Sequence, residues 1–287
     1  MERLAIILLD GSNAILVLML VSLGLAIIFG LMNVINMAHG EFLMLGCYSV
    51  MELNSRGLPF FLALALSPLV VAFIGLVAEE LIIRRTYARL LDTILATWGL
   101  ALVLRQAMVL IYGPGSWSVP APELGEITIA GSPYPVYRLV VMAISLVTIV
   151  ATFWFFFRTR SGLAARAVIA NRDMAACLGI NTRRADRLTF AFGAALAGLA
   201  GAAMAPLISV DPNAGLGWVV PAFLSILVGG LGTISGPLVG AAGVGGLDSL
   251  TAAFTSPVWA QFAVFTAAII VIRLFPNGLV SRRKREA

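Results

Sequence analysis

Long apolar runs dominate the pattern of hydrophobic and polar positions along the chain. A helix needs about 20 apolar residues to cross a bilayer, and such runs occupy residues 12–31, 59–83, 139–157, 188–208 and 260–274. A further span is predicted over residues 93–111, and residues 218–254 form either two short helices or two partial ones. The strands of a membrane β-barrel would alternate polar and apolar residues over about 10 positions. The pattern therefore predicts an all-α polytopic membrane protein.

The predicted protein is a single transmembrane domain over residues 1–287, with about eight or nine transmembrane or partial helices. Composition supports it: 60% of residues are hydrophobic, 11% are charged, and the mean hydropathy is +1.00. Soluble domains carry roughly a quarter charged residues. No secretory leader is recognised at the start of the chain. Cys47 and Cys177 lie in different surroundings and predict neither a disulfide nor a metal site.

The cationic residues predict the topology. They concentrate in residues 84–89, 158–187 and 282–285, which the positive-inside rule assigns to the cytoplasm. The loop over residues 112–137 contains Glu123 and Glu126 and no cation, which predicts the periplasmic side. Three segments before Arg84, the middle one short and broken, then give a periplasmic N-terminus and a cytoplasmic C-terminus.

Two apolar stretches are interrupted. FGLMNVINMAHGEFLMLG (residues 29–46) contains Asn33, Asn36, His39 and Glu41, and VGGLGTISGPLVGAAG (228–243) contains Thr233 among glycines. Interrupted segments in corresponding halves of a transporter tend to line its substrate path, because irregular backbone at membrane depth needs protein or water to satisfy it. These five polar residues are the predicted lining of a translocation pathway.

Each of these features has a second interpretation. His39 is either a satisfied polar contact or a proton relay. Glu41 lies either near the bilayer centre, where a charged side chain costs free energy, or near an interface, where that cost is small. Small residues four apart also permit close helix packing. The glycines with this packing alternative are Gly198, Gly201, Gly232, Gly236 and Gly240.

The basic loop over residues 158–187 is longer than a connection needs. Residues 162–178 have apolar positions at helical spacing, and Gly179 follows as a stop signal. The pattern predicts one short amphipathic helix, which either lies on lipid headgroups or docks on a partner.

The sequence contains no machinery for hydrolysing ATP. A P-loop requires G-x-x-x-x-G-K-[ST], whereas Lys284 is the one lysine of the chain. A lone histidine leaves little acid–base chemistry either. The chain is therefore predicted not to be an enzyme and to bind no cofactor itself.

Three stretches resemble the permease subunits of ABC importers of the branched-chain amino acid and urea/short-amide group. They are INMAHGEFLMLG (35–46), RAVIANRDMAACLGINTRRADRLTFAFGAALAGLAG (166–201) and FPNGLVSRR (275–283). The resemblance implies a bacterial inner-membrane permease, embedded in lipid, that binds no nucleic acid. It also implies three kinds of partner: a second related permease, two cytoplasmic ATPase subunits that use ATP and Mg, and an extracytoplasmic solute-binding protein.

The resemblance also favours docking of the basic loop on the ATPase. It places a coupling helix at Arg172, Asp173, Ala175, Ala176 and Gly179. LDTILATWGLALVLRQ (91–106) is more similar to the urea and short-amide permeases than to the leucine type. The expected cargo is therefore urea or a short amide, with branched-chain amino acids as the alternative.

Two other classes of function stay open at this point. One is a self-sufficient secondary transporter or channel in which His39 and Glu41 carry protons. The other is a membrane scaffold without transport activity.

Overall fold

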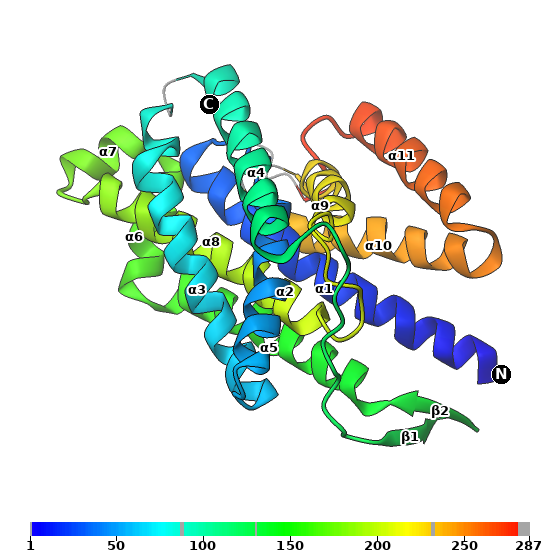
Figure 1. The fold of residues 1–287 in the computed structure, drawn as a ribbon. Coiled ribbons are helices and arrows are strands. Elements are labelled where there is room, and N and C mark those ends of the chain that lie inside the picture. Colours follow the sequence, from blue (N-terminus) through cyan, green and yellow to red (C-terminus); the bar gives the residue numbers. More distant parts are fainter. Residues whose placement is uncertain (1, 87–88, 130, 231–232, 281–287) are drawn as a thin grey trace.

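The computed structural model describes residues 2–86, 89–129, 131–230 and 233–280. Helices account for almost all of its regular structure (Figure 1). The helices are α1 (Glu2–Met32), α2 (His39–Ser55), α3 (Phe60–Leu81), the 3-10 turn η1 (Ile83–Arg85), α4 (Leu90–Tyr112), α5 (Val136–Arg158), α6 (Arg160–Ala170), α7 (Arg172–Cys177), α8 (Thr182–Met204), α9 (Leu216–Gly229), α10 (Gly236–Phe254) and α11 (Pro257–Leu274). The strands are β1 (Glu126–Ile129) and β2 (Ser132–Pro135), paired antiparallel.

The all-α polytopic prediction is confirmed. Seven helices of the described chain are long and apolar enough to span a membrane: α1, α3, α4, α5, α8, α10 and α11. With 17 and 14 residues, α2 and α9 extend about 26 Å and 21 Å, which is short of the roughly 30 Å hydrocarbon core. This region is thus the short helix α9 followed by α10, which is long enough to span, whereas the sequence predicted either two short helices or two partial ones over residues 218–254.

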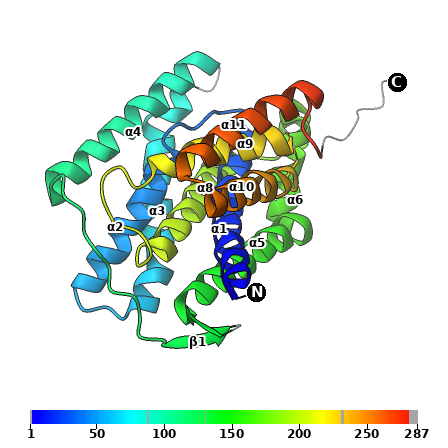
Figure 2. The ribbon, with the colours of Figure 1, turned by 90° about the vertical axis from the view of Figure 1, so that its right-hand side faces the viewer.

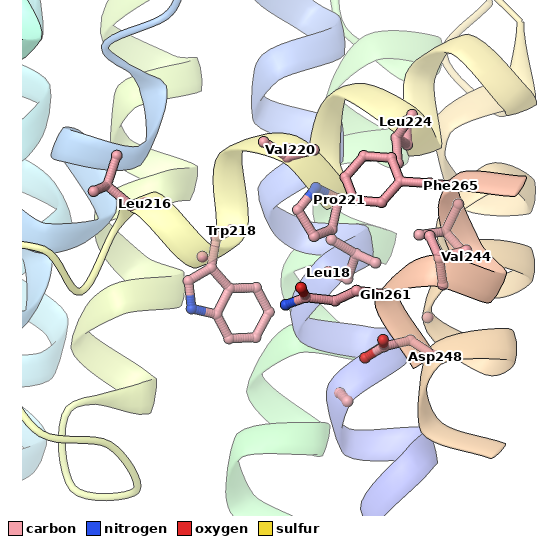
Figure 3. A pocket seen from close by; sticks show the side chains of 14 residues that line it. Leu18, Leu216, Trp218, Val220, Pro221, Leu224, Val244, Asp248, Gln261 and Phe265 are labelled. Carbon is pink, nitrogen blue, oxygen red and sulfur yellow. The ribbon is translucent and has the colours of Figure 1, made fainter. Parts of the chain in front are cut away.

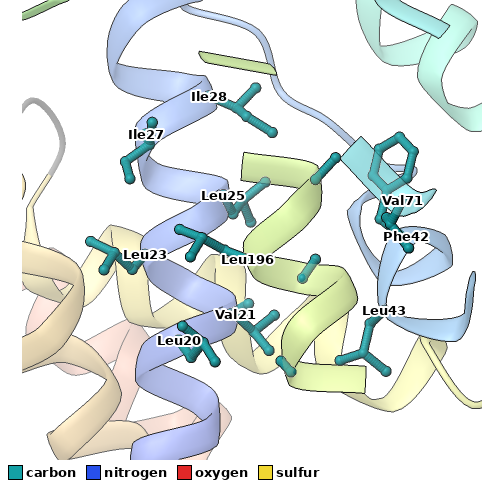
Figure 4. Packing of buried hydrophobic residues seen from close by; sticks show 14 of the residues in the cluster. Leu20, Val21, Leu23, Leu25, Ile27, Ile28, Phe42, Leu43, Val71 and Leu196 are labelled. Atoms are coloured by element: carbon teal, nitrogen blue, oxygen red, sulfur yellow. The ribbon is translucent and has the colours of Figure 1, made fainter. Parts of the chain in front are cut away.

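The centre of the bundle is formed by α1 and α8. Buried side chains of α1, among them Val21 and Leu25, face α8 (Figure 4). Small residues let α8 approach its neighbours closely: a Cβ at Gly201 would lie 1.9 Å from the Leu43 carbonyl oxygen of α2, and one at Gly198 would lie 2.7 Å from Val71 Cβ of α3. Two of the predicted packing glycines therefore sit where α2 and α3 lie against α8.

The arginine clusters lie together at one end of the bundle. Glu80 of α3 accepts hydrogen bonds from Arg84 at 2.7 Å and Arg183 at 2.8 Å, and it also pairs with Arg187. These contacts bring residues 84–89 and the loop 158–187 to the same side. This agrees with the two spanning helices between them, α4 and α5, since an even number of membrane crossings returns the chain to the same side. The third cluster, residues 282–285, lies outside the described residues.

The opposite end carries the β1–β2 hairpin and the start of α1. Asp10 of α1 accepts a hydrogen bond from the Tyr134 hydroxyl at 3.1 Å and forms an ion pair with Arg138. The pKa of Tyr134 is raised, mainly because the hydroxyl is buried and also because the Asp10 carboxylate is next to it. The hydroxyl is therefore protonated at neutral pH and can donate. The hairpin falls within the predicted 112–137 loop.

The prediction of one helix over residues 162–178 is wrong. The segment is two helices, α6 and α7, separated by Asn171 in an extended conformation. The Asn171 side chain accepts a hydrogen bond from the backbone N–H of Met174 at 2.9 Å. This N-cap competes with helix continuation and starts a new helix instead.

Candidate translocation pathway

Both predicted interruptions are breaks in the helices. The first helix ends at Met32, where Asn33 adopts a left-handed φ of 52°, and α2 begins at His39. Between α9 and α10, Gly230 has a φ of 111°, and residues 233–235 are also outside the helices. Such φ values favour Gly and Asn because other side chains clash with the backbone there.

The two breaks meet at one cavity of about 880 Å³ at the arginine-rich end of the bundle. Asn33 lines it from the first break, and Thr233 and Ser235 line it from the second. Two of the five predicted pathway residues, Asn33 and Thr233, are thus brought together although 200 positions separate them in sequence. Other parts of the wall come from α1, α5, α6 and the segment after α11.

The segment after α11 satisfies backbone groups that the second break leaves open. The amides of Leu279 and Val280 donate to the carbonyls of Val228 and Gly229 at 2.9 and 3.0 Å. Gly278, with a φ of 82°, lies so close to Gly230 that a Cβ there would be 2.1 Å from the Gly230 Cα. Val280 also lines the cavity. Bonding the last carbonyls of α9 in this way makes an irregular backbone tolerable at membrane depth.

Arg166 of α6 gives the cavity a positive charge. Its guanidinium lies over the Phe157 ring, 4.8 Å from the ring centroid, and its buried Nε has no partner among the described residues. A cation held against an aromatic face keeps its charge at modest cost. The cavity therefore combines polar backbone, three uncharged polar side chains and one cation.

The other three predicted pathway residues are buried away from this cavity. Asn36 Oδ1 accepts from the Ala38 amide at 3.1 Å, and His39 Nε2 donates to the Val21 carbonyl of α1 at 3.0 Å. Glu41 of α2 forms an ion pair with Arg105 of α4. His39 therefore contacts α1, whereas Glu41 contacts α4.

Arg105 is a residue that the sequence analysis missed. Its side chain is 22% exposed, and that of Glu41 is 2% exposed. A lone arginine inside a predicted span was itself a signal, because a charge within a membrane helix usually has a partner. The identity of that partner, 64 positions away, required the fold.

The predicted coupling residues lie on and next to α7. Arg172 holds this helix to α8 through Asp186, with Nη1 2.9 Å from Oδ1 and a second contact from Nη2. Ala175 is buried, whereas Asp173, Ala176 and Gly179 are exposed. The helix is anchored on one side and presents the other side outward.

Two further predicted packing glycines lie at the second break. A Cβ at Gly240 would be 1.8 Å from the Ser225 carbonyl oxygen of α9, and one at Gly236 would be 2.6 Å from Thr233 Oγ1. Gly232 lies outside the described residues. Gly240 thus packs α10 closely against α9, and Gly236 lies close to the cavity-lining Thr233.

Comparison with known proteins gives one family. Residues 7–273 match the family model described as the permease component of the branched-chain amino acid transport system. The chain is 28% identical to the high-affinity branched-chain amino acid transport system permease protein LivH of Escherichia coli, over 93% of this chain and 92% of that protein. It is 27% identical to BraD of Pseudomonas aeruginosa over the same shares of the two chains.

A relative of lower identity is named for a different cargo. The fructose import permease protein FruG of Bifidobacterium longum is 24% identical over 92% of this chain and 80% of its own length. No solved structure matches the chain. The match over residues 7–273 and the seven apolar spans agree: the chain belongs to the family of permease components of branched-chain amino acid transport systems, and it is a multi-pass protein of the bacterial inner membrane.

Proposed function

We propose that this chain is a translocation subunit of an ABC importer that moves a small polar solute inward. The observation that carries the proposal is the convergence of both helix breaks on the 880 Å³ cavity. Interrupted helices at membrane depth supply polar backbone for a solute while the rest of the bundle stays apolar.

The arginine-rich end is proposed to face the cytoplasm. The positive-inside rule supports this orientation, and it puts the hairpin and the start of α1 in the periplasm. The cavity with Asn33 and Thr233 then lies at the cytoplasmic end of the path. The Glu41–Arg105 pair lies farther from that end, because Arg105 is 15 residues, or about 22 Å, beyond the start of α4.

Power is proposed to come from two ATPase subunits that bind ATP and Mg and seat α7. Its exposed Met174 and Asp173, together with the exposed Leu178 directly after the helix, offer a small mixed apolar and acidic face. A second related permease and an extracytoplasmic solute-binding protein complete the proposed assembly. For the cargo, the LivH and BraD relatives support a branched-chain amino acid over urea or a short amide.

Reconstitution in proteoliposomes tests this function. The complete assembly should import radiolabelled solute only with ATP inside and loaded binding protein outside, and the chain alone should import none. Uptake by the chain alone would instead identify a self-sufficient transporter or channel.

The coupling role has its own variant. Gly179 has a φ of 82°, so Gly179→Leu would strain the turn that follows α7. We expect reduced association with the ATPase subunits and normal membrane insertion. Unchanged ATP-driven uptake in this variant would argue against docking through α7.

A further inference from the structure

The helix α7 is connected to its sequence neighbours by two links that are not helical. Asn171, in an extended conformation, separates it from α6, and Gly179, with a φ of 82°, lies between it and α8. With 6 residues, α7 is also far shorter than a helix that is stable in isolation. Its orientation in the molecule therefore depends on side-chain contacts with the rest of the bundle.

An ion pair bridges the link between α7 and α8. Arg172 donates to the Asp186 carboxylate with both terminal nitrogens, and its Nη1 lies 2.9 Å from Oδ1. The side chain of Asp186 is 2% exposed, whereas that of Arg172 is 43% exposed. A bidentate arginine–carboxylate pair fixes orientation as well as distance. The pair therefore holds α7 in one orientation against the start of α8.

The same part of α8 is tied to a third helix. Glu80, near the end of α3, accepts a hydrogen bond from Arg183 at 2.8 Å and also pairs with Arg187. Asp186 lies between these two arginines in the sequence. Ion pairs thus connect the first turns of α8 to α7 and to α3 at once.

Farther along, α8 touches the helices on both sides of the first break. A Cβ at Gly193 would lie 2.7 Å from the Gly24 carbonyl oxygen of α1, and one at Gly201 would lie 1.9 Å from the Leu43 carbonyl oxygen of α2. Between α1 and α2, Asn33 lines the 880 Å³ cavity. Closely packed interiors transmit displacements because they compress very little. A displacement of α8 therefore shifts the helices that flank this part of the pathway.

We propose that Asp186 is a positioning residue for transport. Through Arg172 it makes α7 and α8 move as one body, so that a movement of α7 by the ATPase subunits reaches the pathway. The inference rests on the proposed importer function and deepens it by naming the residues that carry this movement inward.

The role of Asp186 is distinct from docking and from solute binding. Its carboxylate is buried under Arg172, so an ATPase subunit seated on α7 does not reach it. It lines neither the 880 Å³ cavity nor a second cavity of about 370 Å³ between α1, α9, α10 and α11 (Figure 3). Asp186 therefore acts through Arg172.

The first test measures whether the ion pair fixes α7 on α8. Spin labels are attached to the exposed native Cys177 of α7 and to Leu188→Cys at an exposed position of α8, while Cys47 is buried. In the full chain in lipid nanodiscs we expect one narrow distance distribution, which Asp186→Asn should broaden. The matched control is Arg184→Ala, at an exposed arginine of the same turn that has no ion pair among the described residues, and it should leave the distribution narrow. An equally narrow distribution in Asp186→Asn would overturn the inference.

The second test measures how many solute molecules the complete assembly imports per ATP hydrolysed in proteoliposomes. Radiolabelled L-leucine and urea are both offered as probes. Asp186→Asn should bind the ATPase subunits normally and lower this ratio by about tenfold, the change expected when a charge-assisted contact is lost. Arg184→Ala should stay within about twofold of the wild type. An unchanged ratio in Asp186→Asn, or loss of the ATPase subunits during its purification, would overturn the inference.

A double variant shows whether the two residues act as one unit. Arg172→Gln should also lower the ratio by about tenfold, and its combination with Asp186→Asn should lower it no further, because both changes remove the same pair. A loss of about a hundredfold in the double variant would mean that the residues act independently, and it would contradict the inference. Lack of ATP-driven import by the wild-type assembly would instead contradict the proposed function, and the spin-label distances would still decide whether the pair joins α7 to α8.

Discussion

The helices α8 and α4 have the same length and opposite environments. Each has 23 residues, and the mean hydropathy of the span is 1.4 for α8 and 1.9 for α4. Yet 67% of an 18-residue stretch of α8 is buried, against 17% of an 18-residue stretch of α4. Figure 2 shows α4 at the edge of the bundle, away from α1 and α8. The more hydrophobic helix is thus the more exposed one.

The two helices are held by different forces. In lipid, helices associate through close packing and polar contacts, because the tails are as apolar as the side chains. Glycine and alanine let α8 touch the backbones of its neighbours, as at Gly201 and Leu43. In contrast, α4 is held by polar contacts: Arg105 to Glu41, Thr97 to the carbonyl of Ile35, and Tyr112 to Glu52.

The largest effect is expected from breaking the ion pair of α4. Arg105→Ala leaves the Glu41 carboxylate buried without its cation, and removing one partner of a buried pair costs about 3–5 kcal/mol. The free energy of unfolding in detergent should fall by that amount, and a second change, Glu41→Gln, should restore part of it. Arg89→Ala, at the exposed pair with Asp92 where α4 begins, should cost no more than about 1 kcal/mol. Equal losses for the two arginines would mean that α4 does not depend on this pair.

The next effect concerns the packing of α8. Gly201→Leu forces a side chain into the Leu43 backbone, and overpacking of this kind costs about 1–3 kcal/mol or more. The thermal midpoint of the purified chain should drop. The matched control is Gly99→Leu on α4, where an added Cβ meets no atom within 4 Å, and it should leave the midpoint nearly unchanged. A comparable drop at Gly99 would show that α4 is packed as closely as α8.

A smaller effect is expected at the end of α4. Tyr112→Phe removes the hydrogen bond to Glu52 Oε2, which is 3.1 Å long, and keeps the contact with the Tyr48 ring. One such bond contributes about 0.5–1.5 kcal/mol. Chemical denaturation in detergent should detect a loss of that size. A loss larger than that measured for Arg105→Ala would mean that this hydrogen bond holds α4 more strongly than the Glu41–Arg105 pair does.

The smallest effect should come from the outer face of α4. Leu95 is 71% exposed, so Leu95→Ala should change the free energy of unfolding of the isolated chain by no more than about 0.5 kcal/mol. The free energy of unfolding should also be measured for Leu95→Ala in the complete importer. A larger loss there would mean that another subunit covers α4, and an unchanged value would mean that lipid covers it.

The amino-acid sequence by itself determined the spans, the two breaks and the clustering of arginines. Each depends on neighbouring residues: a run of apolar side chains long enough to cross a bilayer, or polar and glycine residues such as Asn33 and Gly230 that interrupt it. Local patterns also misled, since the spacing over residues 162–178 favoured one helix and the cap at Asn171 made two.

Only the tertiary structure decided which residues meet. Asn33 and Thr233 share a cavity, Glu41 finds Arg105, and Asp186 holds Arg172, although none of these pairs is contiguous in sequence. Tertiary packing also put the less hydrophobic α8 at the centre. In lipid, helices associate through the close packing of small residues and not through hydropathy, because the lipid tails are as apolar as the side chains. The positions of spans follow from local composition, and their partners follow from shape and charge.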